Sequence, residues 1–265
     1  MAQQQRSATH PAPVIMVGFI KFIKRIAAFV LAPLVVAFCL QAYFSITGAV
    51  AWQDLTWMLV GLVGYFAIYV VINSNNLRFL ETLEHELNHA VTSILSFNTV
   101  GKFRVSFPKY ADPDAYREEQ KYSGIVTYVP NGCFFITLSP YFLPLITIPL
   151  LVIRPIMPAP LVPVLTILIG STLGFHYAAL IKEFRPFQPD IKEQTLLFSF
   201  VIAVLFNVVI LVLVISVVVD NIRLTFDYLR EALARSFGYY SVIAAWIGGL
   251  GIPAKLQEIV TLLSA

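Results

Sequence analysis

Charged residues are scarce in this chain. Only 12% of its 265 residues are Asp, Glu, Lys or Arg, whereas hydrophobic residues make up 58%. A soluble domain usually contains about a quarter charged residues. This scarcity argues against an ordinary soluble protein and predicts an integral membrane protein. The formal net charge is only +3, with basic and acidic residues interspersed, so we expect no nucleic-acid partner.

Cysteine is nearly absent, and several common sequence patterns are missing. The two cysteines, Cys39 and Cys133, both lie in apolar runs. Cysteines in such surroundings usually act as small buried hydrophobic side chains, so we expect neither a disulfide nor cysteine ligation of zinc. The sequence has no internal repeat, no heptad pattern and no glycine-rich nucleotide-binding loop. Repeat proteins, coiled coils and nucleotide-binding folds are therefore not expected.

Long hydrophobic runs are abundant, and they predict an all-α polytopic membrane protein with five to six transmembrane helices. A spanning helix needs about 20 apolar residues. One apolar segment, residues 133–153, contains Pro140, Pro144 and Pro149, which predict a kinked or broken helix. The uninterrupted spans are expected at residues 26–50, 57–72, 161–181 and 195–219.

Composition divides the chain into three regions. Residues 1–25 form a polar tail and a basic amphipathic segment, which we expect to lie along the membrane surface. Residues 26–220 form the membrane-embedded domain, and within it residues 98–131 form a β-rich insertion that we expect to be a small β-hairpin. Residues 221–265 are expected to form amphipathic, interfacial helices, with a further crossing as the alternative.

A polar cluster stands out within "LRFLETLEHELNHAVTSILSF", residues 77–97. His85, Glu86 and His89 match the pattern H-E-x-x-H. Positions i and i+4 share one face of an α-helix, so two imidazoles can bind one Zn²⁺ while the glutamate accepts a proton from water. Zinc lowers the pKa of bound water to about 7, which permits attack on a carbonyl at neutral pH. The alternative is a histidine pair that only makes hydrogen bonds between helices.

A catalytic zinc site needs a third protein ligand and an open fourth position. Two candidates remain, His176 in "LGFHYAAL" and Asp190 in "FQPDI". The residues alone do not choose between them. If both bind the metal, the site is closed and a structural role becomes the better interpretation.

The distribution of basic residues predicts the orientation of these segments. If the helix at residues 77–97 returns to the side from which it came, 13 of the 18 Lys and Arg residues face that side. The positive-inside rule makes this side cytoplasmic. We therefore expect a cytoplasmic N-terminus, a cytoplasmic 98–131 insertion, and His85 and Asp190 on the same side of the membrane.

Several segments together resemble the site-2 proteases, which are intramembrane zinc metallopeptidases, and more narrowly their bacterial membrane metallopeptidase-like branch. These segments are "HELNHAVTSILSF", "SGIVTYV", "LSPYFLPL" and "GFHYAALIKEFRPFQPDI". The resemblance covers about residues 77–195. It implies that His85 and His89 are zinc ligands and that Glu86 is the catalytic base.

The resemblance also implies that Asp190 is the third ligand. His176 is then an alternative ligand, or a residue that contacts the ligands without binding the metal itself. Two positions depart from the family pattern. Ile191 follows the aspartate where the family usually has glycine, and Asn88 precedes the second histidine where glycine is common. The first departure bears on the Asp190 assignment, whereas the second changes no ligand.

The implied function is hydrolysis of a peptide bond in a membrane-associated protein near the cytoplasmic boundary of the bacterial inner membrane. The expected partners are a membrane-protein substrate and the lipid bilayer, and no pattern defines an oligomeric state. Strands near residues 103–107 and 124–129 would hold the substrate extended by adding it as a strand, or would simply cover the cytoplasmic face.

Two other functions remain open. The first is a non-proteolytic membrane protein, such as a transporter or scaffold, with a structural or regulatory zinc site. Glu86 argues against it, because a structural site needs no base between its ligands. The second is a peptidase for soluble substrates whose catalytic helix lies on the membrane surface, since Glu81 and Glu84 add charge to that helix.

Overall fold

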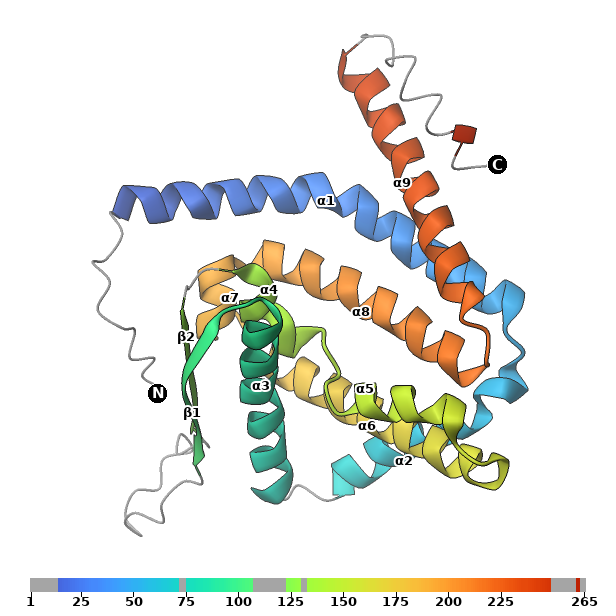
Figure 1. The fold of residues 1–265 in the computed structure, drawn as a ribbon. Helices are drawn as coiled ribbons and strands as arrows, with labels where there is room; N and C mark the ends of the chain where they lie inside the picture. Colours follow the sequence, from blue (N-terminus) through green and yellow to red (C-terminus); the bar gives the residue numbers. More distant parts are fainter. Residues whose placement is uncertain (1–13, 72–74, 107–122, 130–132, 249–260, 263–265) are drawn as a thin grey trace.

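The structure, a computed structural model, describes residues 14–71, 75–106, 123–129, 133–248 and 261–262. The described part is mainly α-helical (Figure 1). Its elements are α1 (Val14–Ala49), η1 (Trp52–Leu55), α2 (Thr56–Val71), α3 (Asn75–Leu95), β1 (Thr99–Ser106), β2 (Ser123–Val129), α4 (Phe134–Leu138), η2 (Ser139–Tyr141), α5 (Thr147–Ile153), η3 (Arg154–Ile156), η4 (Ala159–Leu161), α6 (Val162–Glu183), α7 (Pro189–Gln194), α8 (Leu196–Val218) and α9 (Arg223–Gly248).

Four segments of the described chain are long and apolar enough to cross a membrane, which supports an integral membrane protein. The expected count of five to six was too high for these residues. The spans contain α1, α2, α6 and α8, and their bounds are Met16–Ala49, Trp52–Val71, Ala159–Glu183 and Leu196–Val218.

The segment at residues 133–153 accounts for one missing span, because it is broken into α4, η2 and α5. Pro140 lies within η2 and Pro144 follows it, and proline cannot donate the backbone hydrogen bond that would continue a helix. Cys133 precedes α4 and is exposed, so its expected burial was wrong, whereas Cys39 is half-buried. The proline positions thus turn a predicted crossing into a bent segment.

The two flanking regions of the chain both contribute to long helices in the described structure. The basic segment before residue 26 is continuous with α1, a single helix of 36 residues that contains Pro33. Such a helix is about 54 Å long, well beyond the roughly 30 Å of a bilayer core. At the other end, α9 is not one of the four candidate spans. It packs along α1, where Tyr228 meets Phe38 edge to face with ring centroids 5.7 Å apart.

Helix α8 organises the packing of the other helices. It contributes to three separate clusters of buried apolar residues. Val214 and Ile215 pack with α2, α5 and α6, whereas Phe198 and Ile202 pack with α1, α7 and the η2 segment. Val212 belongs to the third cluster, with α1 and α9. The helix is surrounded on several sides, which explains why it is apolar along its whole length.

Helices α2 and α6 approach each other closely at two glycines. A Cβ atom added to Gly61 would lie 2.0 Å from the Ile167 carbonyl oxygen, and one added to Gly170 would lie 2.0 Å from the Met58 carbonyl oxygen. Both contacts are with backbone atoms, so the helices themselves would have to separate. Small residues commonly permit this close approach between membrane helices.

Replacing Gly170 by alanine is therefore expected to destabilise the protein by about 1–3 kcal/mol, the usual cost of overpacking. Gly64→Ala is a matched control, because nothing lies within 4 Å of a Cβ atom placed there. Thermal unfolding of the detergent-purified variants measures the difference. Equal melting temperatures for the two variants would contradict the close packing of α2 against α6.

Helix α3 and the two strands follow one another in the chain and are in contact. Phe97, with a left-handed φ of 58°, ends the helix, and the Asn98 amide bonds the Ser93 carbonyl at 2.8 Å. The chain then enters β1, which pairs antiparallel with β2 and places Thr99 opposite Val129. Both strands contact α3, and they overlap the β-type runs expected from the sequence. The expected cytoplasmic location remains a prediction.

Candidate metal centre

Helix α3 places His85 and His89 one turn apart on the same face. The helix differs from the four candidate spans because its inward face is polar. Glu81 is buried and pairs with Lys182 at the end of α6, and Glu84 is buried as well. The ion pair docks α3 against α6, and α3 also contacts α4 and η2 of the proline-broken segment. The two glutamates are therefore packed inside the protein.

Asp190 reaches the same place from a distant part of the sequence. It lies in the first turn of α7, directly after Pro189. Proline is favoured at the start of a helix, and a carboxylate in the first turn interacts well with the helix dipole. The neighbouring Ile191 is fully buried in an apolar cluster and fixes α7 in position. Asp190 is thus held by local packing rather than by a flexible loop.

His85, His89 and Asp190 form a group that could hold a metal ion. The Nε2 atoms of His85 and His89 lie 3.3 Å apart. The Asp190 Oδ2 atom lies 3.2 Å from His85 Nε2 and 3.4 Å from His89 Nε2. His89 and Asp190 are buried and His85 is half-buried. Three donor atoms therefore converge on one point in a largely enclosed site.

The remaining nitrogen of each histidine is bonded to an acceptor. His85 Nδ1 lies 2.7 Å from Glu183 Oε2, and His89 Nδ1 lies 2.9 Å from the Ile136 carbonyl oxygen. A carbonyl oxygen and a carboxylate can only accept, so both Nδ1 atoms donate and the Nε2 lone pairs are directed at the shared point. Metal-binding histidines almost always have such outer partners.

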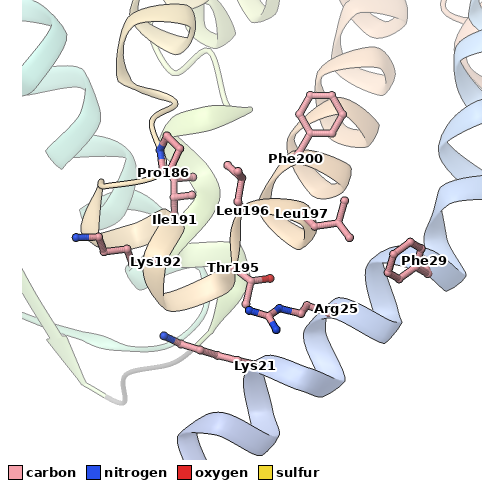
Figure 2. Close-up of a pocket in the computed structure, with 10 residues that line it drawn as sticks. All are labelled: Lys21, Arg25, Phe29, Pro186, Ile191, Lys192, Thr195, Leu196, Leu197 and Phe200. Atoms are coloured by element: carbon pink, nitrogen blue, oxygen red, sulfur yellow. The ribbon is translucent and has the colours of Figure 1, made fainter.

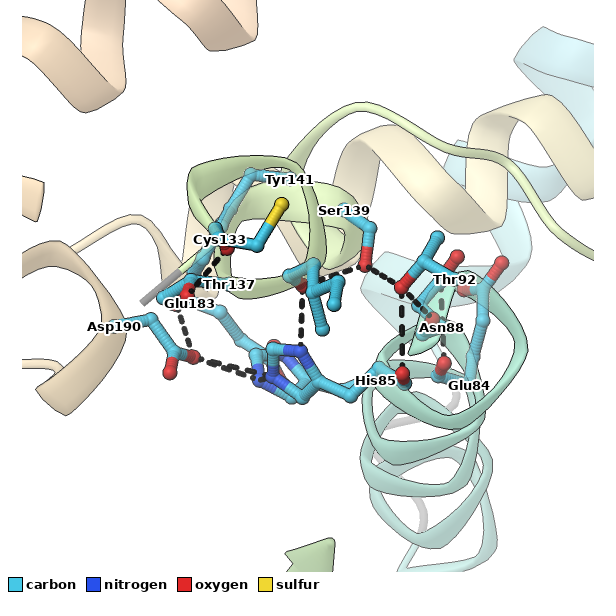
Figure 3. Close-up of polar contacts among 12 residues, drawn as sticks. Glu84, His85, Asn88, Thr92, Cys133, Thr137, Ser139, Tyr141, Glu183 and Asp190 are labelled. Atoms are coloured by element: carbon cyan, nitrogen blue, oxygen red, sulfur yellow. Dashed lines mark hydrogen bonds and ion pairs between the residues drawn. The ribbon is translucent and has the colours of Figure 1, made fainter. Parts of the chain in front are cut away.

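Two residues that sequence reasoning missed surround the ligands. Glu183, at the end of α6, contacts His85 Nδ1 and holds the His85 ring. Tyr141, in η2, points its hydroxyl towards Asp190 Oδ2 at 3.5 Å and meets the His85 ring edge to face with centroids 5.6 Å apart (Figure 3). Tyr141 lies in the quoted segment "LSPYFLPL", but only the fold shows its contact.

Removing the outer partner of His85 tests its contribution. Glu183→Ala is expected to weaken metal binding by about 10–100-fold, because the His85 ring loses its tautomer and orientation. Glu183→Gln, which keeps an acceptor oxygen without the charge, is expected to lie between this variant and wild type. Asp54→Asn, on the exposed η1 turn, is the control for loss of one carboxylate. Metal competition with a chromophoric chelator measures the affinities, and unchanged binding in Glu183→Ala would refute this role.

The charges of the site shift the pKa values of its carboxylates in opposite directions. Burial alone would raise the pKa of Asp190, but the His89 and His85 imidazoles outweigh it and hold that pKa well below the usual range. Asp190 is therefore ionised, as a metal ligand must be. Burial also raises the pKa of Glu86, and the two histidines only partly offset this effect. A carboxylate of raised pKa is the better proton acceptor at neutral pH.

His176 is not a member of the group of possible metal ligands found among the described residues. It is buried in α6, and its Nε2 atom has no hydrogen-bond partner among the described residues. Asn207 of α8 donates to the Tyr141 carbonyl at 2.8 Å and so braces the segment that contains Tyr141. The side chain of Asn88 donates to the Glu84 carbonyl at 3.1 Å within α3. Of the two third-ligand candidates, the structure brings Asp190 to the histidines.

Comparisons with protein-family models, with curated protein sequences and with solved structures found no match to this chain.

Proposed function

We propose that this protein is a membrane-embedded zinc peptidase in which His85, His89 and Asp190 hold the metal and Glu86 is the base. The proposal rests above all on the spacing of the three donor atoms, 3.2 to 3.4 Å. Two ligands at tetrahedral angles and zinc distances of about 2.0–2.1 Å lie about 3.3–3.4 Å apart. The agreement, with a mixed imidazole and carboxylate donor set, favours zinc.

The site also has the composition of a catalytic centre. Three protein ligands leave a fourth position open, as hydrolytic zinc sites require. A zinc ion bound there would polarise a carbonyl and lower the pKa of water to about 7. Glu86 would accept the proton of the attacking water and return it to the leaving nitrogen. Asp190 and Glu183 would hold the ligand geometry without taking part in proton transfer.

A peptide bond is the substrate that this arrangement suits best. Proteolysis needs a substrate peptide in an extended conformation. Strands β1 and β2 lie against α3, the helix that provides the two histidines. Each strand has one edge left unpaired in the two-stranded sheet of the described residues. An extended substrate segment could add to such an edge by backbone hydrogen bonds. The four apolar spans favour a substrate that is itself anchored in the membrane.

The test is the appearance of new N-termini. Wild-type protein in proteoliposomes is mixed with a detergent-solubilised membrane-protein extract, and N-termini are labelled and identified by mass spectrometry. We expect a set of new N-termini near membrane boundaries, abolished by 1,10-phenanthroline and restored by added zinc. Bound zinc without any new N-terminus would contradict the peptidase and favour a structural or regulatory metal site.

A further inference from the structure

A separate cavity of about 730 Å³ lies between α1, α7 and α8 (Figure 2). None of its lining residues belongs to the metal-ligand group. Its volume is within the range of sites that bind small molecules, about 300–1,000 Å³. The proposed hydrolysis gives this cavity no role. Its lining side chains are basic at one end and apolar at the other, as in a binding site for an amphipathic ligand.

One end of the cavity is positively charged. Lys21 and Arg25 are four residues apart and lie on the same face of α1, and Lys192 of α7 lines the opposite wall. No Asp or Glu is among the described residues that line the cavity. Three cationic side chains around one opening, without a lining carboxylate, form a site for an anion.

The other end is apolar and open. Phe29 continues the face of Lys21 and Arg25 one turn further along α1 (Figure 2). Leu197 and Phe200 of α8 line the opposite wall, beyond Lys192 in the chain. Phe29 is 71% exposed and Phe200 is 55% exposed. Both walls therefore change from basic to apolar in the same direction, and the apolar end opens to the outside of the helix bundle.

A hydroxyl group without a partner lies between the two ends. Thr195 joins α7 to α8 with φ 72° and ψ 141°, a conformation that β-branched residues rarely adopt. Its side-chain oxygen is buried without a hydrogen-bond partner in the described structure, and the residue lines the cavity. Figure 2 shows this hydroxyl directed towards the space beside Arg25. Unpaired buried polar atoms are rare, so a bound acceptor would explain it.

We propose that this cavity binds one anionic phospholipid. Its phosphate would lie between Lys21, Arg25 and Lys192 and accept the Thr195 hydroxyl, while an acyl chain would lie along the apolar end beside Phe29. Basic pockets between membrane helices are typical sites for anionic lipid head groups. The order of basic and apolar side chains matches the order of head group and chain in one molecule. The inference is independent of the proposed hydrolysis.

Native mass spectrometry of delipidated, detergent-purified protein tests this site. The protein is titrated with palmitoyl-oleoyl-phosphatidylglycerol and with the phosphatidylcholine of the same chains. We expect the anionic lipid to bind at least tenfold more tightly. The double variant Lys21→Gln, Arg25→Gln is expected to lose about tenfold or more of that affinity, from about two lost head-group charges.

Two controls separate this site from general attraction and from a simple anion site. Arg223→Gln with Arg230→Gln removes two exposed charges from α9 and is expected to leave lipid binding unchanged. Leu197→Trp fills the apolar end, keeps every charge, and is expected to weaken phosphatidylglycerol binding. Equal binding of both lipids, an equal loss in the α9 variant, or full displacement of the lipid by inorganic phosphate would overturn the proposal.

Discussion

Glu86→Gln is expected to retain the wild-type zinc content and to lower the rate of peptide hydrolysis by about 10²–10⁴-fold, the usual contribution of a general base. Glutamine has the same shape but cannot accept the proton from water. Glu86 is half-buried beside His85, and it is not one of the three converging ligands. Loss of the Glu86 carboxylate should therefore lower the rate of hydrolysis without lowering zinc binding. The measurements are metal content and the release of new N-termini by the same preparation.

Glu193→Gln is the appropriate control for this experiment, because it removes a carboxylate from α7 outside the metal-ligand group. It is expected to keep both the metal and the activity. Hydrolysis by Glu86→Gln at the wild-type rate would remove the base from the proposed mechanism. Loss of zinc in Glu86→Gln would instead assign this residue to metal binding.

Asp190→Ala is expected to weaken zinc binding by more than about a hundredfold, which exceeds the effect of losing an outer partner. The variant removes one of the three donor atoms. The Nε2 atoms of His85 and His89 then have no carboxylate oxygen beside them at the metal position. His176→Gln is expected to keep the zinc content of wild type, because His176 lies outside the group. Metal content by mass spectrometry after dialysis compares the two variants.

The stability of both variants must be measured beside their metal content, because both residues are buried. Asp190→Asn, which keeps the size of the side chain, is expected to bind zinc more weakly than wild type and more tightly than Asp190→Ala. Retention of zinc by a folded Asp190→Ala variant together with its loss in His176→Gln would reverse the assignment. Loss in both would favour the closed, structural site.

The part of the site that could be predicted from sequence is the part that depends on local geometry. His85 and His89 are four residues apart in a helix, so their shared face follows from the helical repeat alone. Asp190 is 105 residues away from His85, and its preference over His176 came from the resemblance of its segment. Its place beside the histidines depends on α7, which is fixed by packing that no local pattern records.

The outer partners could not be found in this way. Glu183 ends a long apolar helix, where a charged residue normally marks only the membrane boundary, and its contact with His85 joins residues 98 apart. The partner of His89 is the backbone carbonyl of Ile136, an apolar residue. Every residue has a backbone carbonyl, so the sequence does not indicate which one accepts this hydrogen bond, and only the fold identifies it.

The fold shows the same division between local and distant information. Uninterrupted apolar runs predicted the four candidate membrane spans to within a few residues at most ends, because length and hydropathy decide a membrane span. The prolines at 140 and 144 also predicted a break, but not that the broken segment would fail to form a spanning helix. The packing of α9 against α1 depends on contacts such as Tyr228 with Phe38, which join distant residues.

Zinc K-edge X-ray absorption of the purified wild-type protein tests the metal centre most directly. The account predicts about one zinc per chain, four-coordinate, with only nitrogen and oxygen ligands at about 2.0–2.1 Å and scattering from two imidazoles. The Asp190→Ala spectrum should lose the carboxylate contribution or the zinc itself. A wild-type protein that holds no zinc, or one whose zinc has a sulfur ligand at about 2.3 Å, would contradict it.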